Sequence, residues 1–75
     1  MYLNGGLNMY RYEVRENKFS YCGKRTYNFS IYDKWENRNI ASGFHNEWEA
    51  KLWYNNSNLS ILDLDYETKY VGNYF

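Results

Sequence analysis

The chain contains 75 residues with nine basic and nine acidic side chains, so its formal net charge is zero, and aromatic residues make up 23% of it. This balance excludes a strongly basic nucleic-acid binder and an acidic mimic of nucleic acid, because both depend on an excess of one charge. The length allows one small domain, which tight packing or oligomerisation must stabilise because only one cysteine is present.

The chain starts with a short stretch, MYLNGGLN, that precedes a second Met-Tyr pair. The codons of Gly5-Gly6 can form a purine-rich stretch like a ribosome-binding site, at the usual distance from a start codon at Met9. We therefore expect residues 1–8 to be a leader or a disordered extension and residues 9–75 to form a single α+β domain. A short edge strand at Tyr2-Leu3 is the alternative.

Three strands are predicted in the first half of the chain. Residues 10–15 alternate between apolar and charged side chains, which is the period of a half-buried strand. After a polar break at residues 16–18, residues 19–22 form a short second strand that stops at Gly23. Residues 27–35 form the third strand. One of its faces carries four apolar side chains, Tyr27, Phe29, Ile31 and Trp35. Alternatively, the second and third segments form one long hairpin that turns at Gly23.

A hairpin loop at residues 36–39 and a return strand at residues 40–44 precede the only predicted helix. Asn46 is a suitable N-cap, because its side chain can accept a hydrogen bond from a free amide of the first turn. Glu49 lies three residues later, where its carboxylate can reach back to the amide of the cap. We expect the helix to end near Tyr54, before a run of polar residues.

Residues 59–71 alternate strictly and predict a final strand. The residues expected on one of its faces are Leu62, Leu64, Tyr66 and Tyr70, and those on the other are Asp63, Asp65, Glu67 and Lys69. The order β-β-β-β-α-β predicts an α+β fold, in which an antiparallel sheet of four to five strands carries one short helix packed on one face.

No sequence motif indicates catalysis or a bound cofactor. Cys22 and His45 are the only thiol and the only imidazole, and neither a nucleophile elbow nor a phosphate-binding glycine loop is present. We expect no enzymatic activity, no cofactor and no metal site.

Lys24 and Arg25 lie between aromatic residues that include Tyr21 and Tyr27. Basic residues among exposed rings bind single-stranded nucleic acid by stacking and by phosphate contacts. These rings follow the pattern of a buried face, so we expect core packing next to a charged turn rather than direct binding of nucleic acid. Contact of these four residues with a nucleotide is the alternative.

The helix carries two apolar stripes. Ala50, Trp53 and Tyr54 lie on one side, whereas Trp48 and Leu52 lie on another. A single helix on a sheet buries one stripe, so the other stripe is exposed unless a curved sheet or the end of the chain covers it. An exposed Trp beside a Leu is typical of a protein interface, and we therefore assign Trp48 and Leu52 to partner binding.

Asp63, Asp65 and Glu67 place three carboxylates on one face of the final strand. Alternate residues of a strand lie about 7 Å apart, which is too far for all three to hold one small cation. A solvated strand face and an acidic stripe that meets a basic groove of a partner are both open, and we include the three residues in the partner-binding set.

The segment 27–55 combines a strand, a hairpin and the motif Gly-Phe-x-Asn-Glu-x-Glu-Ala before a helix. This combination resembles a pattern of small accessory proteins from phages and mobile elements of low-GC bacteria. In size, codon bias and lack of catalytic residues the chain is similar to phage anti-defence proteins, including anti-CRISPR proteins, although many of those are acidic. The resemblance implies action by occupation of a surface or of a nucleotide ligand.

We therefore expect a non-enzymatic binding protein, a phage-encoded inhibitor that occludes the protein surface of a CRISPR-type defence complex in the cytoplasm of an infected bacterium. The alternatives are an oligomeric sponge that sequesters a nucleotide signal and a homodimeric phage structural or regulatory protein. No segment is apolar enough to predict a membrane span. The excess of aromatic residues fits either an interface or the codon bias of a low-GC genome.

Overall fold

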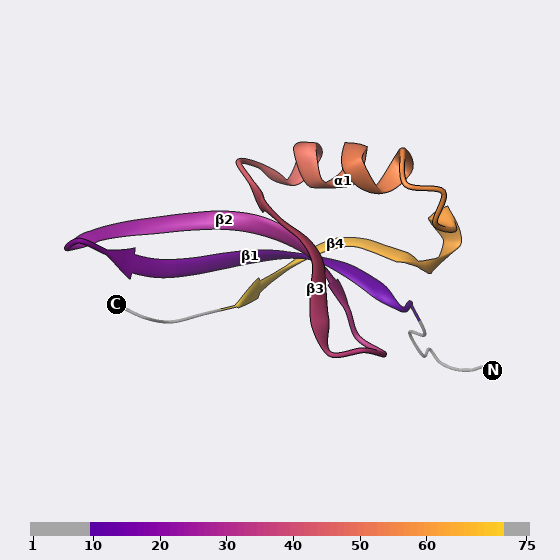
Figure 1. Ribbon diagram of the computed structural model, residues 1–75, viewed down its shortest axis with the longest axis horizontal. Coiled ribbons are helices and arrows are strands. Elements are labelled where there is room, and N and C mark those ends of the chain that lie inside the picture. The colour runs from indigo at the N-terminus through magenta and orange to yellow at the C-terminus, as the bar shows by residue number, and fades with distance from the viewer. Residues whose placement is uncertain (1–9, 72–75) are drawn as a thin grey trace.

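The computed structural model describes the backbone of residues 10–71 and the side chains of that range except those of residues 19–21 and 24–27. The predictions for residues 1–8 and for an initiator at Met9 lie outside the described residues. The elements follow in this order: β1 (Tyr12–Tyr21), β2 (Lys24–Asp33), β3 (Arg38–Phe44), α1 (Glu47–Asn55), a short 3-10 helix η1 (Ile61–Asp63) and β4 (Leu64–Val71). The predicted α+β fold is confirmed, with α1 on one side of a four-stranded sheet (Figure 1).

The sheet is mixed rather than purely antiparallel, which corrects one detail of the prediction. Its strand order is β3-β2-β1-β4; β2 is antiparallel to both of its neighbours, whereas β4 is parallel to β1. The connection through α1 leads from one edge of the sheet to the other (Figure 1). Such a helical crossover brings the chain back to the same end of the sheet, so the following strand is parallel to the strand before the helix.

β1 and β2 form one long hairpin. This confirms the alternative prediction of a hairpin that turns at Gly23, whereas the predicted strand break at residues 16–18 was wrong. The polar residues there are paired across the hairpin, since Asn17 Nδ2 donates to Ser30 Oγ at 2.9 Å and to Asn28 Oδ1 at 3.3 Å. The turn consists of Cys22 and Gly23, with φ of 53° and 77°. Two successive positive φ values are typical of the type I′ turn, whose twist matches that of the two strands.

β2 ends at Asp33, so the prediction that Trp35 belongs to the strand and to its apolar face was wrong. The Asp33 carboxylate accepts hydrogen bonds from the amides of Trp35 at 2.9 Å and Glu36 at 3.2 Å, and these bonds bend the chain into a turn. Arg11 binds both oxygens of the same carboxylate, at 3.0 and 2.9 Å. This hydrogen bonding lowers the pKa of Asp33, while the Trp35 ring stays 69% exposed against the Arg11 guanidinium.

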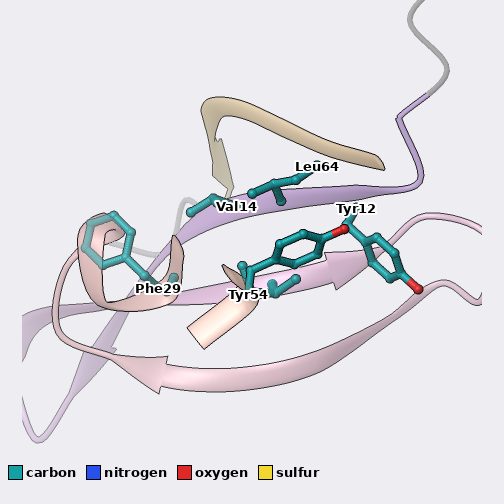
Figure 2. Close-up of a cluster of buried hydrophobic side chains, with 7 residues drawn as sticks. Tyr12, Val14, Phe29, Tyr54 and Leu64 are labelled. Atoms are coloured by element: carbon teal, nitrogen blue, oxygen red, sulfur yellow. The ribbon is translucent and has the colours of Figure 1, made fainter. Parts of the chain in front are cut away.

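The core lies between α1 and the sheet and contains few aliphatic side chains (Figure 2). Its buried apolar residues are Tyr12, Val14, Phe29, Ile31, Ala50, Tyr54 and Leu64. Tyr12 and Tyr54 meet edge to face, with ring centroids 5.6 Å apart. The Tyr54 hydroxyl donates to the carbonyl oxygen of Ser60 at 2.5 Å, so the largest buried side chain also anchors the loop after α1.

The last strand is shorter than predicted, because residues 59–63 do not belong to it. The Ser60 side chain accepts a hydrogen bond from the Leu62 amide at 3.2 Å and starts η1, in which Leu62 is 80% exposed. Leu62 therefore does not share a strand face with Leu64, which is buried in the core. The sequence alternates through this segment, but the local cap at Ser60 prevails over the period-two pattern.

Candidate functional site

The start of α1 fixes the rotation of the helix and hence the side chains that it exposes. The Asn46 side chain accepts a hydrogen bond from the Glu49 amide at 2.8 Å, which confirms the predicted N-cap. The Glu49 carboxylate reaches one residue further back than expected and accepts from the amide of His45 at 2.7 Å. This bond from the His45 backbone is the main cause that lowers the pKa of Glu49.

Of the two stripes of α1, the one with Ala50 and Tyr54 faces the sheet, and both residues are fully buried. Trp53, from the same stripe, lies at the margin and is 37% exposed. Trp48 and Leu52 are 69% and 61% exposed, so the stripe assigned to partner binding is the exposed one. These two residues, one helical turn apart, are called the outer face of α1 below.

Lys51 lies beside this outer face and is buried, although it carries a charge. Its Nζ atom is 4.9 Å from the centre of the Trp48 ring and 5.0 Å from the centre of the Tyr66 ring. An ammonium within about 6 Å of a ring centre is attracted by the negative face of the ring. The two rings therefore enclose the ammonium, and they link α1 to β4.

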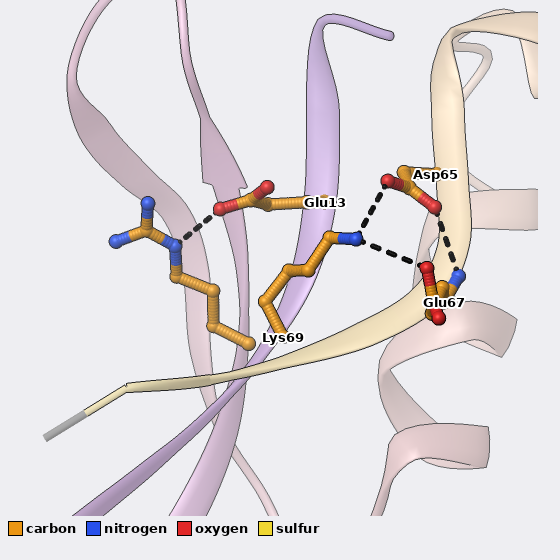
Figure 3. Close-up of polar contacts among 5 residues, drawn as sticks. Glu13, Asp65, Glu67 and Lys69 are labelled. Carbon is orange, nitrogen blue, oxygen red and sulfur yellow. Dashed lines mark hydrogen bonds and ion pairs between the residues drawn. The ribbon is translucent and has the colours of Figure 1, made fainter. Parts of the chain in front are cut away.

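The three carboxylates of the predicted acidic stripe do not form one surface. Asp63 belongs to η1, outside the strand. Lys69 Nζ lies 3.2 Å from Asp65 and 3.3 Å from Glu67, and Figure 3 shows the lysine between these two carboxylates. The hydrogen bond with Asp65 is the main cause that raises the pKa of Lys69. Asp65 is almost fully buried, so only Asp63 and Glu67 present a carboxylate to solvent.

An irregularity in β4 explains this contact between residues four positions apart in a strand. Glu13 pairs with Asp65 and Arg15 pairs with Lys69, so two steps along β1 correspond to four steps along β4. The extra residues form a bulge that brings Lys69 back over Asp65. Beside them, Arg15 Nε donates to Glu13 at 2.6 Å, so two carboxylates on neighbouring strands each have a basic partner (Figure 3).

The four residues assigned to a possible nucleotide contact lie where β1 and β2 meet. In the backbone register, Tyr21 pairs with Lys24, while Arg25 pairs with Ser20 and Tyr27 with Lys18. This end of the hairpin contains the exposed Cys22. The side chains of residues 21, 24, 25 and 27 are outside the described part of the structure, so their contact with a nucleotide stays a prediction.

His45 and Cys22 belong to separate elements. His45 Nδ1 lies 3.3 Å from the Glu49 carboxylate at the start of α1, whereas Cys22 is in the hairpin turn. Among residues 10–71, no group of three or more His, Cys, Asp and Glu side chains has a geometry that could hold a metal ion. In the same range, no helix is long and apolar enough to cross a membrane.

Lys51 and Tyr66 were missed as candidate site residues. The spacing of Trp48 and Lys51, three residues apart on a helix, is a local signal that could have placed the ammonium near the indole ring. Nothing local indicates Tyr66, because its position depends on the bulge and on the parallel pairing of β4 with β1.

Comparison with known proteins gives no assignment. No family model matches the sequence, and neither a curated protein nor a solved structure is significantly similar to the chain.

Proposed function

We propose that this protein acts without catalysis, by binding another protein through the outer face of α1. The observation that carries the proposal is the exposure of Trp48 and Leu52 on one side of a helix whose opposite side is packed on the sheet. A tryptophan ring offers about 150–250 Å² of contact area, and tryptophan is enriched among the residues that dominate binding energy.

The helix presents this face in a defined orientation. Asn46 caps its start, and at its end the amide of Asn56 donates to the carbonyls of Leu52 and Trp53. The buried Tyr54 holds the last turn through its hydroxyl. A rigid contact surface loses little conformational freedom on binding, which favours affinity.

Asp63 and Glu67 supplement this contact with charge. Lys69 contacts both Asp65 and Glu67, but the Glu67 side chain is 82% exposed whereas that of Asp65 is only 8% exposed. Exposed charges at the rim of an interface act mainly on the association rate and on its salt dependence. The proposed contact set is therefore Trp48 and Leu52 with Asp63 and Glu67 at the rim, and Asp65 supports the strand instead.

The resemblance to phage anti-defence proteins suggests the partner, a CRISPR-type ribonucleoprotein complex of a bacterial host, whose surface this protein would occlude. A homodimer that uses the same outer face is an outcome that the experiment below has to separate. The nucleotide sponge depends on Tyr21, Lys24, Arg25 and Tyr27, whose side chains the structure does not describe.

The test uses purified CRISPR effector complexes, with binding followed by biolayer interferometry and target cleavage measured in parallel. The double variant Trp48→Ala/Leu52→Ala is expected to lose at least about 30-fold in affinity, since truncation of an interface anchor costs about 2 kcal/mol or more. The variant should still fold with a modestly lower melting temperature, because both side chains are exposed but the Trp48 ring contacts the Lys51 ammonium.

The matched control is Trp35→Ala, because Trp35 is as exposed as Trp48 but lies in the turn between β2 and β3. This variant should keep full affinity. A folded double variant with unchanged affinity would contradict the proposed contact. A wild-type dimer in sedimentation velocity that dissociates in the double variant would assign the face to self-association instead.

A further inference from the structure

The starting observation is the burial of a lysine whose charge has no anionic partner in the described part of the chain. Lys51 is 7% exposed, and its Nζ atom lies between the rings of Trp48 and Tyr66. Among the described residues, its ammonium takes part in no hydrogen bond or salt bridge, and it contacts only these two rings. Buried lysines usually have a paired carboxylate, so the two rings have replaced it here.

A carboxylate is nearby in sequence but has another partner. Glu47 precedes Lys51 by four residues, the spacing at which a Glu–Lys pair forms on a helix. The Glu47 carboxylate instead accepts a hydrogen bond from the Thr68 hydroxyl of β4 at 2.6 Å. This bond fixes α1 against β4 two residues from Tyr66, so the two aromatic walls are held in place by a contact that does not involve Lys51.

We propose that Trp48 and Tyr66 form a two-walled aromatic site for a positively charged side chain of the partner, and that Lys51 occupies this site in the free protein. The proposal deepens the proposed function and rests on it only for the source of the cation. Two rings around one cation are the arrangement by which proteins recognise ammonium groups. Glu47, four residues before Lys51 on α1 and bonded to Thr68 of β4, places a negative charge beside the two rings and favours a cationic ligand over an anionic one.

Exchange of Lys51 for a cation of the partner is feasible because, within residues 10–71, only the two rings contact the ammonium. The lysine side chain has a flexible four-carbon stem and a strongly hydrated end, so Lys51 can turn toward solvent or toward Glu47 when the site is taken. Trp48 is 69% exposed and Tyr66 is 45% exposed, so both walls are accessible from outside. An arginine of the partner is the favoured occupant, since its planar and weakly hydrated guanidinium stacks on aromatic faces.

The resident lysine also sets how well a free cation binds. A group tethered by a short flexible chain competes at an effective concentration on the order of millimolar or higher. A small cation in solution therefore binds the wild type poorly and binds well only after Lys51 has been removed. The expected gain on removal of the Lys51 charge is at least about tenfold in affinity.

The experiment titrates tetramethylammonium chloride into ¹⁵N-labelled protein and follows the indole N–H signal of Trp48, with sodium chloride at equal ionic strength as the reference. Lys51→Met keeps most of the buried stem and removes the charge. This variant should bind tetramethylammonium at least about tenfold more tightly than the wild type, with a saturable shift of the Trp48 signal. Trp48→Ala in the Lys51→Met background should abolish the binding, measured by calorimetry.

Lys18→Met is the matched control. The Lys18 ammonium contacts one ring instead of two, that of the exposed Tyr70, at 5.8 Å from the ring centre. It should not increase tetramethylammonium binding. Equal affinity of wild type and Lys51→Met, or shifts that sodium chloride reproduces, would overturn the two-walled site. If Lys51→Met does not fold, the same titration of the wild-type protein tests whether a free cation displaces Lys51 from the two rings. Saturating tetramethylammonium should then remove the ring-current shift of the Lys51 ε protons, and persistence of that shift overturns the proposal.

The two proposals fail separately. If Lys51→Met does not bind tetramethylammonium while Trp48→Ala/Leu52→Ala still weakens partner binding, the cation site is wrong and the outer face of α1 stands. If Lys51→Met binds tetramethylammonium while the double variant keeps full partner affinity, the aromatic site exists but the proposed contact with the partner is wrong.

Discussion

The hydroxyl of Tyr54 is buried in the core and holds the loop after α1 through its bond to the Ser60 carbonyl. Tyr54→Phe removes this hydroxyl and leaves the ring, which keeps its edge-to-face contact with Tyr12. The Ser60 carbonyl also accepts a hydrogen bond from the Asp63 amide at 3.0 Å, so it keeps a donor in the variant. The loss is therefore near that of an ordinary hydrogen bond, about 1 kcal/mol at neutral pH.

The pH dependence of this difference has a defined sign. Burial raises the pKa of the Tyr54 phenol to about 12, and the charge of Asp63 contributes in the same direction. In the unfolded chain the phenol has a pKa of about 10. Below about pH 10 both states keep the proton, and the full stabilisation is present. As the pH rises toward about 12, the unfolded state loses its proton first, so the wild type becomes less stable.

At about pH 11 this loss is on the order of 1.4 kcal/mol, which is as large as the contribution of the hydrogen bond. Wild type and Tyr54→Phe should therefore differ by about 1 kcal/mol at about pH 8, which corresponds to about 4–8 °C in melting temperature for a domain of this size. The two stabilities should cross near pH 11, within about half a unit.

The assay is urea unfolding followed by far-ultraviolet circular dichroism at a series of pH values. The control is Tyr70→Phe, which changes a ring that is 70% exposed and should show no crossing with the wild type. A stability difference between wild type and Tyr54→Phe that stays constant up to about pH 11 would refute the reasoning about burial of the phenol. A variant more stable than the wild type at neutral pH would refute the contribution of the hydrogen bond.

Two further predictions concern turns of the sheet. Asp33→Asn should lower the melting temperature at neutral pH, and the difference from wild type should shrink as the pH falls below about 3.9, because the lowered pKa of Asp33 stabilises the fold only while its carboxylate is charged. A difference independent of pH in thermal unfolding would contradict the role of the Arg11 hydrogen bonds. Cys22→Asn should stabilise the protein by roughly 0.5–1 kcal/mol in urea unfolding, because asparagine tolerates the positive φ of 53° at the first position of the type I′ turn. Ser42→Asn, at an exposed position of β3 without a positive φ, should bring no such gain.

Local patterns were sufficient for the type and order of most elements and for the two apolar stripes of α1, but they left open which stripe faces the sheet. The N-cap at Asn46, the two stripes of the helix and the alternation along β1, β2 and the latter part of β4 all follow from interactions between residues a few positions apart. The errors in the strand bounds also have local causes, because side-chain hydrogen bonds to nearby amides prevailed over the alternating pattern of a strand. The Asp33 turn ended β2 early, and the Ser60 cap replaced the start of the last strand by η1.

Only the tertiary structure decided the pairing of β4 with β1 and everything that depends on it. The parallel direction of β4 follows from the crossover through α1, and the bulge brings Lys69 over Asp65, so the predicted acidic stripe is divided. The same bulge lies in the segment that brings Tyr66 to Lys51 and Trp48. Backbone periods and caps act over a few residues, whereas contacts between strands and helix depend on the path of the whole chain. For this reason the sequence by itself determined the two apolar stripes of the helix, and only the fold decided which stripe is exposed and enclosed a lysine between two rings.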